Sequence, residues 1–133
     1  MRRLYSAFIL LAFFGVAPAF GAAIELNSDY PGANVRVERM EGDTIHVAPD
    51  LRHTQKGQWW FYWNFGIRGD AGREVTVVFR DKNPIGVRGP ALSLDSGKSW
   101  GWMGAAVVKE GKHEGKRSWS FTVTLPASGE ARV

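Results

Sequence analysis

The sequence predicts an all-β protein, an antiparallel β-sandwich that follows an N-terminal signal peptide. Three observations predict it: a basic and then apolar start, several short segments in which apolar and polar residues alternate, and many turn-forming residues. The chain has 133 residues, about enough for one domain, with 16 Gly, 6 Pro and no Cys. We therefore expect a signal peptide at residues 1–21 and one sandwich domain at residues 22–133.

The first segment has the order of a secretory signal. Arg2 and Arg3 give a positive start, residues 4–16 form an apolar run, and small residues offer cleavage points after Ala19 or Gly21. The run is shorter than the ~20 residues of a membrane-spanning helix, so we expect export to the periplasm or beyond without a permanent membrane anchor. Removing the two arginines lowers the formal charge from +4 to +2. Such a small excess argues against a nucleic-acid partner.

The strongest strand signal lies at residues 59–68, where apolar residues recur at every second position. One face of this run carries Trp59, Phe61, Trp63, Phe65 and Ile67. The opposite face, with Trp60 and Tyr62, is mixed. A Gly-containing turn at residues 69–72 follows, and residues 74–80 alternate again. We therefore expect these two runs to form a β-hairpin.

Residues 118–125 give the cleanest amphipathic strand, with four apolar side chains alternating with four hydroxyls. Weaker strand signals lie at residues 33–40, 44–47, 91–94 and 131–133. The charged run at 109–117 predicts a solvated loop, and no segment has a helical period. Strands with one apolar face each are buried best by two packed sheets, with a small barrel as the alternative.

Motifs for catalysis, cofactors or metals are absent. No histidine begins a His-x-x-Glu motif, no Gly-x-Ser-x-Gly turn presents a serine nucleophile, and no loop has the Gly-Lys-Ser/Thr ending that holds phosphates. The lack of Cys excludes thiolate metal sites. We expect no cofactor, and a site assembled by His46, His53 and His113 from separate strands is the one metal-binding alternative that remains open.

One structural motif is present: residues 93–100 resemble an Asp-box, the short hairpin that recurs in the blades of sialidase propellers. Its signature positions are Ser93, Asp95, Gly97 and Trp100. The chemistry is structural, because an aspartate accepts backbone N–H bonds in the turn and a glycine allows a positive φ. A propeller needs one such hairpin in several blades, so a single copy predicts a hairpin and no glycosidase.

The many aromatic residues can belong either to the core or to a binding surface. The odd-numbered residues of 59–67 are expected in the core, whereas Trp60, Tyr62 and Trp102 are candidates for the opposite face. Amphipathic aromatic side chains on such a face can contact a neighbouring domain, or stack on a sugar or a peptide. We therefore take these three residues as the candidate ligand or interdomain surface.

A family resemblance comes from the segment 52–65. Arg52-His53-Thr54-Gln55, followed by the aromatic run 59–65, resembles the Arg-His-Thr-x-Trp-Phe-Tyr-Phe pattern of one accessory domain. That domain is the β-sandwich preceding the catalytic domain in cytosolic-type zinc carboxypeptidases and their bacterial relatives. Glycine and proline turns at 67–73 and 84–91 also resemble it, and the similarity spans residues 24–133. The sequence departs from the pattern by an insertion at 56–58 and by lacking the zinc-ligand motif of the peptidase.

The resemblance implies a non-catalytic sandwich that packs beside a carboxypeptidase active site. The leading hypothesis is thus an exported accessory domain, not an enzyme by itself, that is truncated or acts with a carboxypeptidase catalytic domain. The alternative is a periplasmic module that binds carbohydrate or peptidoglycan through exposed aromatic rings. A small independent hydrolase is a third, weaker hypothesis.

Overall fold

The computed structural model describes residues 21–51 and 62–133. Several predictions concern residues outside these ranges. They are the signal peptide expected at 1–21 (except Gly21), the motif at 52–55 with His53, and the first residues of the aromatic run, including Trp60. The described chain is almost entirely β, with one short 3-10 helix, η1 (Ala105–Val107). This confirms the all-β prediction. Within the same ranges, no helix has the length and apolar character needed to cross a membrane.

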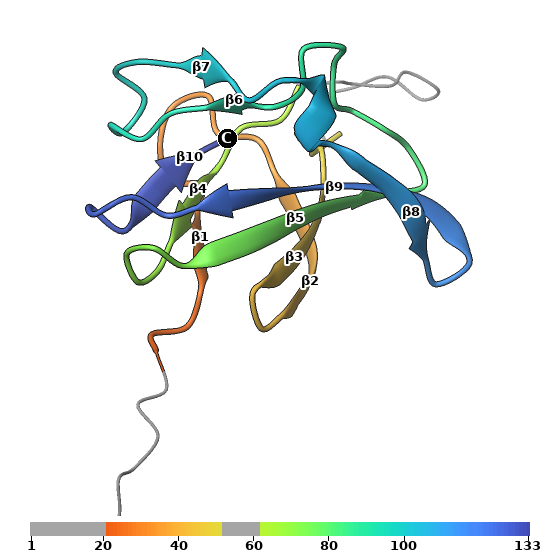
Figure 1. The fold of residues 1–133 in the computed structure, drawn as a ribbon, viewed down its shortest axis with the longest axis horizontal. Helices are drawn as coiled ribbons and strands as arrows, with labels where there is room; N and C mark the ends of the chain where they lie inside the picture. Colours follow the sequence, from red (N-terminus) through yellow and green to blue (C-terminus); the bar gives the residue numbers. More distant parts are fainter. Residues whose placement is uncertain (1–20, 52–61) are drawn as a thin grey trace, which may run out of the picture.

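Two sheets form the body of the domain (Figure 1). The three-stranded sheet has the order β1 (Glu25–Asn27), β4 (Gly66–Arg68) and β10 (Glu130–Arg132), and both of its pairs are antiparallel. The five-stranded sheet has the order β2 (Arg36–Glu41), β3 (Thr44–Ala48), β5 (Glu74–Arg80), β9 (Lys116–Thr124) and β8 (Lys109–His113). Its β3–β5 pair is parallel, so this sheet is mixed rather than wholly antiparallel.

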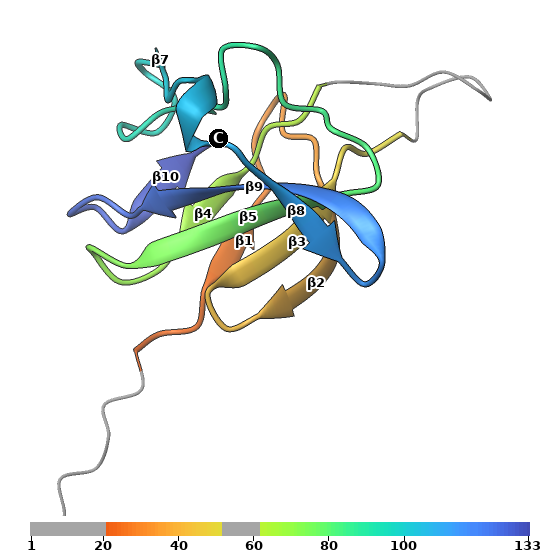
Figure 2. The same ribbon diagram turned by 45° about the vertical axis from the view of Figure 1, so that its right-hand side comes forward.

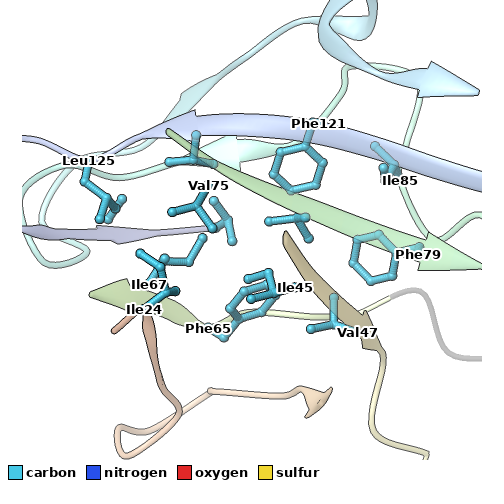
Figure 3. Packing of buried hydrophobic residues seen from close by; sticks show 14 of the residues in the cluster. Ile24, Ile45, Val47, Phe65, Ile67, Val75, Phe79, Ile85, Phe121 and Leu125 are labelled. Carbon is cyan, nitrogen blue, oxygen red and sulfur yellow. The ribbon is translucent and has the colours of Figure 1, made fainter. Parts of the chain in front are cut away.

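The core lies between these sheets (Figure 3). Alternate residues of β5 and β9 supply much of it, since every second side chain of a strand points to the same face. Val75, Val77, Phe121 and Val123 are at most 1% exposed. From the aromatic run, Phe65 is fully buried, as its odd position predicted.

The expected hairpin between residues 59–68 and 74–80 is wrong. The end of the first run forms β4, which pairs with β1 and β10, whereas the second run forms β5 in the other sheet. The turn between them therefore crosses from one sheet to the other. Its amides at Gly69 and Gly72 donate to the carbonyls of Gly129 and Leu125, which anchors the crossing to the end of the chain.

The prediction of a loop at residues 109–117 is also wrong. This segment forms β8 and the start of β9, joined by a tight turn at Glu114 and Gly115 that both have positive φ. All residues of β8 except His113 are exposed. A strand that is polar on both faces has no apolar period, so the alternation used to recognise the other strands was absent.

A small third sheet covers one end of the sandwich. It consists of β6 (Ala91–Leu92) and β7 (Gly101–Trp102), joined by the predicted hairpin at residues 93–100. Ser93 and Arg132 exchange two backbone hydrogen bonds of 2.9 Å, which fasten this hairpin to β10. Figure 1 shows β6 and β7 above β10 and β4 at this end of the molecule.

Candidate functional site

A hollow lined mainly by aromatic rings and prolines lies at the β6–β7 end. It has a volume of about 490 Å³, and we call it the aromatic groove. Its lining residues are Tyr62, Trp63, Asn64, Pro84, Gly86, Gly89, Pro90, Ala91, Trp100, Trp102 and Val133. None of these side chains is ionised at neutral pH, so the groove offers apolar contact and few polar groups.

The chain leading into β4 supplies one wall of the aromatic groove. Trp63 packs inward on Phe79, with ring centroids 5.0 Å apart, and its Nε1 donates to the carbonyl of Pro84 at 3.2 Å. Tyr62 points the other way and is 46% exposed, while its hydroxyl donates to the carbonyl of Gly32. These neighbouring residues thus point to different sides: Trp63 packs against the core and reaches the groove from within, whereas the Tyr62 ring is exposed.

The hairpin between β6 and β7 supplies the opposite wall. Asp95 organises it, because its carboxylate accepts hydrogen bonds from the hydroxyl of Ser93 and from both the amide and the hydroxyl of Ser99. These bonds favour the ionised form and lower the pKa of Asp95 to about 2, with the Ser99 hydroxyl as the largest cause. Gly97 takes the positive φ that the motif predicted.

Trp100 and Trp102 are presented by this hairpin on the same side. The Nε1 of Trp100 donates to the carbonyl of Gly97 at 3.2 Å, which fixes the ring across the turn. Trp100 is 44% exposed and Trp102 is 60% exposed. Both rings line the aromatic groove, so this end of the domain exposes two large apolar side chains in one hollow.

The loop between β5 and β6 forms the floor of the aromatic groove. Gly89 has φ of +75°, and a Cβ on it would lie 2.1 Å from the carbonyl oxygen of Gly104. The backbone of the two segments therefore meets at a distance that only glycine permits. The amide of Met103 also donates to Pro90 at 2.8 Å, so loop and β7 form one unit.

Arg88 places a cation beside one ring of the aromatic groove. The guanidinium of Arg88 lies 5.8 Å from the ring centroid of Trp102, within cation–π range. Arg88 therefore covers part of the indole and adds positive charge beside an otherwise uncharged surface.

Three residues were predicted as a ligand or interdomain surface. Two of them, Tyr62 and Trp102, line the same groove, although 40 positions separate them in the sequence. Trp60 lies outside the described residues. The predicted surface did not include Trp100, which was assigned to the hairpin, or Arg88. The shared parity of positions 100 and 102 was the available signal for Trp100, because alternate residues of an extended strand face the same side.

Two of the three histidines approach each other away from the aromatic groove. The rings of His46 and His113 have centroids 4.4 Å apart, and His53 is outside the described residues. Over residues 21–51 and 62–133, no three His, Asp or Glu side chains are grouped so that they could hold a metal ion. The guanidinium of Arg39 contacts His113 and Glu114, so a cation already stands among these side chains.

Comparison with solved structures shows where this fold recurs. The metallo-carboxypeptidase from Burkholderia cenocepacia matches with a TM-score of 0.57 and 16% identity, over 83% of this chain and 28% of that chain. A putative carboxypeptidase from Burkholderia mallei ATCC 23344 matches with a TM-score of 0.57 and 18% identity, over 84% of this chain and 28% of that chain. No family model and no curated protein matches the sequence.

The chain therefore has a fold that is similar to part of two carboxypeptidases, and it spans a little over a quarter of their length. At these identities the likeness concerns the fold, because function resides in sites rather than in folds. In the described part of this chain, no group of metal-ligating side chains accompanies that fold.

Proposed function

We propose that this chain is a non-catalytic accessory domain of a zinc carboxypeptidase, either as a piece of a longer peptidase or as a separate partner of one. The observation that carries the proposal is the fold match to two carboxypeptidases over only 28% of each. The sequence resemblance to the sandwich that precedes the catalytic domain supports the same role.

The aromatic groove is the surface that we assign to the catalytic domain. Three of its rings are exposed, none of its lining side chains is charged, and its polar side chains are few. Sugar recognition needs several hydrogen-bond partners for hydroxyl groups, whereas the buried centre of a protein interface is apolar and rich in Tyr and Trp. The composition of the groove therefore favours a protein surface over a glycan.

A binding experiment tests this role with a partner of stated chemistry. The zinc carboxypeptidase catalytic domains of the source organism are purified, and the binding of each to this chain is measured by calorimetry. We expect one of them to bind wild-type chain and to bind Trp102→Ala at least tenfold more weakly. The exposed Trp102 side chain contributes little to the fold, so the variant should keep its melting temperature.

A matched control is Thr124→Ala, an exposed change on β9 that does not line the groove. It should bind like the wild type. If none of the catalytic domains binds, or if Trp102→Ala binds as tightly as the control, the interdomain role of the groove is wrong. Binding of peptidoglycan fragments that Trp102→Ala abolishes would instead support the glycan-binding alternative.

Export is the second part of the proposal, supported by the sequence of residues 1–21. Expression of the full chain in a Gram-negative host, followed by N-terminal sequencing of the periplasmic fraction, tests it. We expect a mature chain that begins at Phe20 or Ala22, after one of the two cleavage points. Full-length chain retained in the cytoplasm would contradict export.

A further inference from the structure

The outer face of the five-stranded sheet carries a cluster of charged and imidazole side chains that the accessory role does not use. It lines a hollow of about 110 Å³ between β2, β3, β5 and the β8–β9 turn. The residues are Glu38, Arg39, His46, Arg80, His113 and Glu114. None of them lines the aromatic groove, so the two sites are separate.

The β8–β9 turn lies against β2 and β3 at this cluster (Figure 2). Glu114 bridges two strands, because its carboxylate accepts hydrogen bonds from Arg39 on β2 at 2.8 Å and from Arg80 on β5. His113 contacts the guanidinium of Arg39. Glu114 has φ of +49°, a conformation that side chains with a Cβ rarely adopt, so these contacts hold an unfavourable turn in place.

His46 is the buried member of the cluster. It is 4% exposed, and its Nε2 makes no hydrogen bond. His113 covers its ring at 4.4 Å, Arg39 is its cross-strand neighbour, and Glu41 approaches Nε2 at 3.5 Å. On β5 its neighbour is the uncharged Val78. Burial, His113 and Arg39 lower the pKa of His46 below its ordinary value of 6.5, with burial as the largest cause, and Glu41 only partly opposes them.

We propose that the contact between His46 and His113 is an acid-sensitive clasp, which holds the β8–β9 turn on the sheet while both rings are neutral and releases it when they are protonated. Protonation would place two imidazolium ions beside the guanidinium of Arg39, one of them on the buried ring of His46. Glu38 and Glu114 already pair with arginines, and Glu41 pairs with Arg39. No further carboxylate faces His46 from the described residues to offset the added charge.

The pH range of the release follows from the direction of these effects. Because the fold lowers the pKa of His46, the neutral ring stabilises the clasped form above pH 6.5, and this contribution is lost as the pH falls below 6.5. The Glu114 carboxylate does not titrate in this range, since its hydrogen bond to Arg39 lowers its pKa below 4.5.

NMR relaxation of the purified chain between pH 7.5 and 5.0 tests the clasp, with both imidazole rings titrated in the same samples. We expect the order parameter of the Gly115 amide to fall from about 0.85 to below about 0.6 as the rings become protonated, whereas the Phe121 amide in the core stays near 0.85. An order parameter of Gly115 that remains near 0.85 after both rings are protonated would overturn the proposal.

A pair of variants assigns the effect to the imidazole. His113→Gln keeps an amide that can contact Arg39 but does not titrate, so its Gly115 order parameter should change by less than about a third as much as that of wild type. Lys112→Gln, an exposed change next to it on β8, should respond as wild type does. An equal response in His113→Gln and wild type would show that another group titrates, and would overturn the clasp.

Discussion

A single carboxylate determines the shape of the hairpin that carries two of the groove's rings. Asp95 collects hydrogen bonds from Ser93 and Ser99, and Ser93 in turn accepts from the amide of Gly97 at 2.8 Å. The turn therefore closes on itself through side-chain to backbone bonds, as aspartate and serine commonly do in turns. Trp100, directly after Ser99, is positioned by this closure.

The first prediction concerns the ionisation of Asp95. Ser99→Ala removes the largest cause of its lowered pKa, so the pKa should rise from about 2 towards 3.8. Carboxyl carbon chemical shifts measured by NMR from pH 1.5 to 6 check this. Because the pKa is lowered by folding, the stabilisation that the carboxylate gives is present above pH 3.8 and is lost as the pH falls through about 2.

Ser128→Ala serves as the control for this titration. It removes an exposed hydroxyl whose hydrogen bond goes to Glu130 rather than to Asp95, so it should leave the Asp95 titration unchanged. The account of the hairpin would be wrong if Ser99→Ala also left the curve in place.

The second prediction uses two glycines that share the same backbone conformation. Gly72→Ala, at φ of +78° with no atom within 4 Å of the new Cβ, should cost only the left-handed strain of about 1–2 kcal/mol. Gly89→Ala has similar strain, and its Cβ also meets the carbonyl of Gly104 at 2.1 Å. It should therefore destabilise at least twice as much, as urea denaturation of both variants would measure. Equal losses would contradict the close backbone approach beneath the groove.

At the scale of elements, the third prediction concerns β9, a strand of the five-stranded sheet whose inward side chains lie in the core. Phe121 is 1% exposed between the two sheets, so Phe121→Ala should lower the free energy of unfolding by about 3–5 kcal/mol. Thr124→Ala lies on the outer, exposed face of the same strand and should change it by no more than about 0.5 kcal/mol. Urea denaturation compares them, and similar losses would show that the inward face was assigned wrongly.

Elements with an apolar period were predictable from the sequence, and their pairing was not. The alternation at 118–125 correctly placed Trp119 and Phe121 inward, and residues 74–80 correctly formed a strand. The error was to pair the latter with the preceding run. A turn signal such as 69–72 marks a change of direction, but β4 finds its partners β1 and β10 far away in the sequence, which a local pattern does not contain.

For the groove and the histidine cluster too, the sequence showed the residue types but not which of them meet in space. The aromatic character of Tyr62 and Trp102 was visible in the sequence, whereas their shared hollow depends on the bridge that brings Ser93 to Arg132. For His46 and His113, the approach depends on the β8–β9 hairpin. That hairpin carries no apolar period, so no pattern in its residues predicted its place in the sheet.

For the whole molecule, the core and the groove share structural parts. Trp63 packs on Phe79 and Phe121 in the core, and its Nε1 holds the loop at Pro84 that lines the groove. Leu92 and Met103, which belong to the β6–β7 unit, pack against the core cluster. The groove is therefore built on the sandwich rather than appended to it.

The fourth prediction follows from this sharing: the β6–β7 unit and the sandwich should unfold in one transition. The Nε1–H signals of Trp100 and Trp102 report the groove, and those of Trp63 and Trp119 report the core, in a single NMR titration with urea. We expect all four to lose intensity at the same midpoint, since domains of this size commonly unfold as one unit. Midpoints for Trp100 and Trp102 well below the other two would show that the bonds between Ser93 and Arg132 do not couple the hairpin to the sheet, and that the groove is a separately ordered attachment.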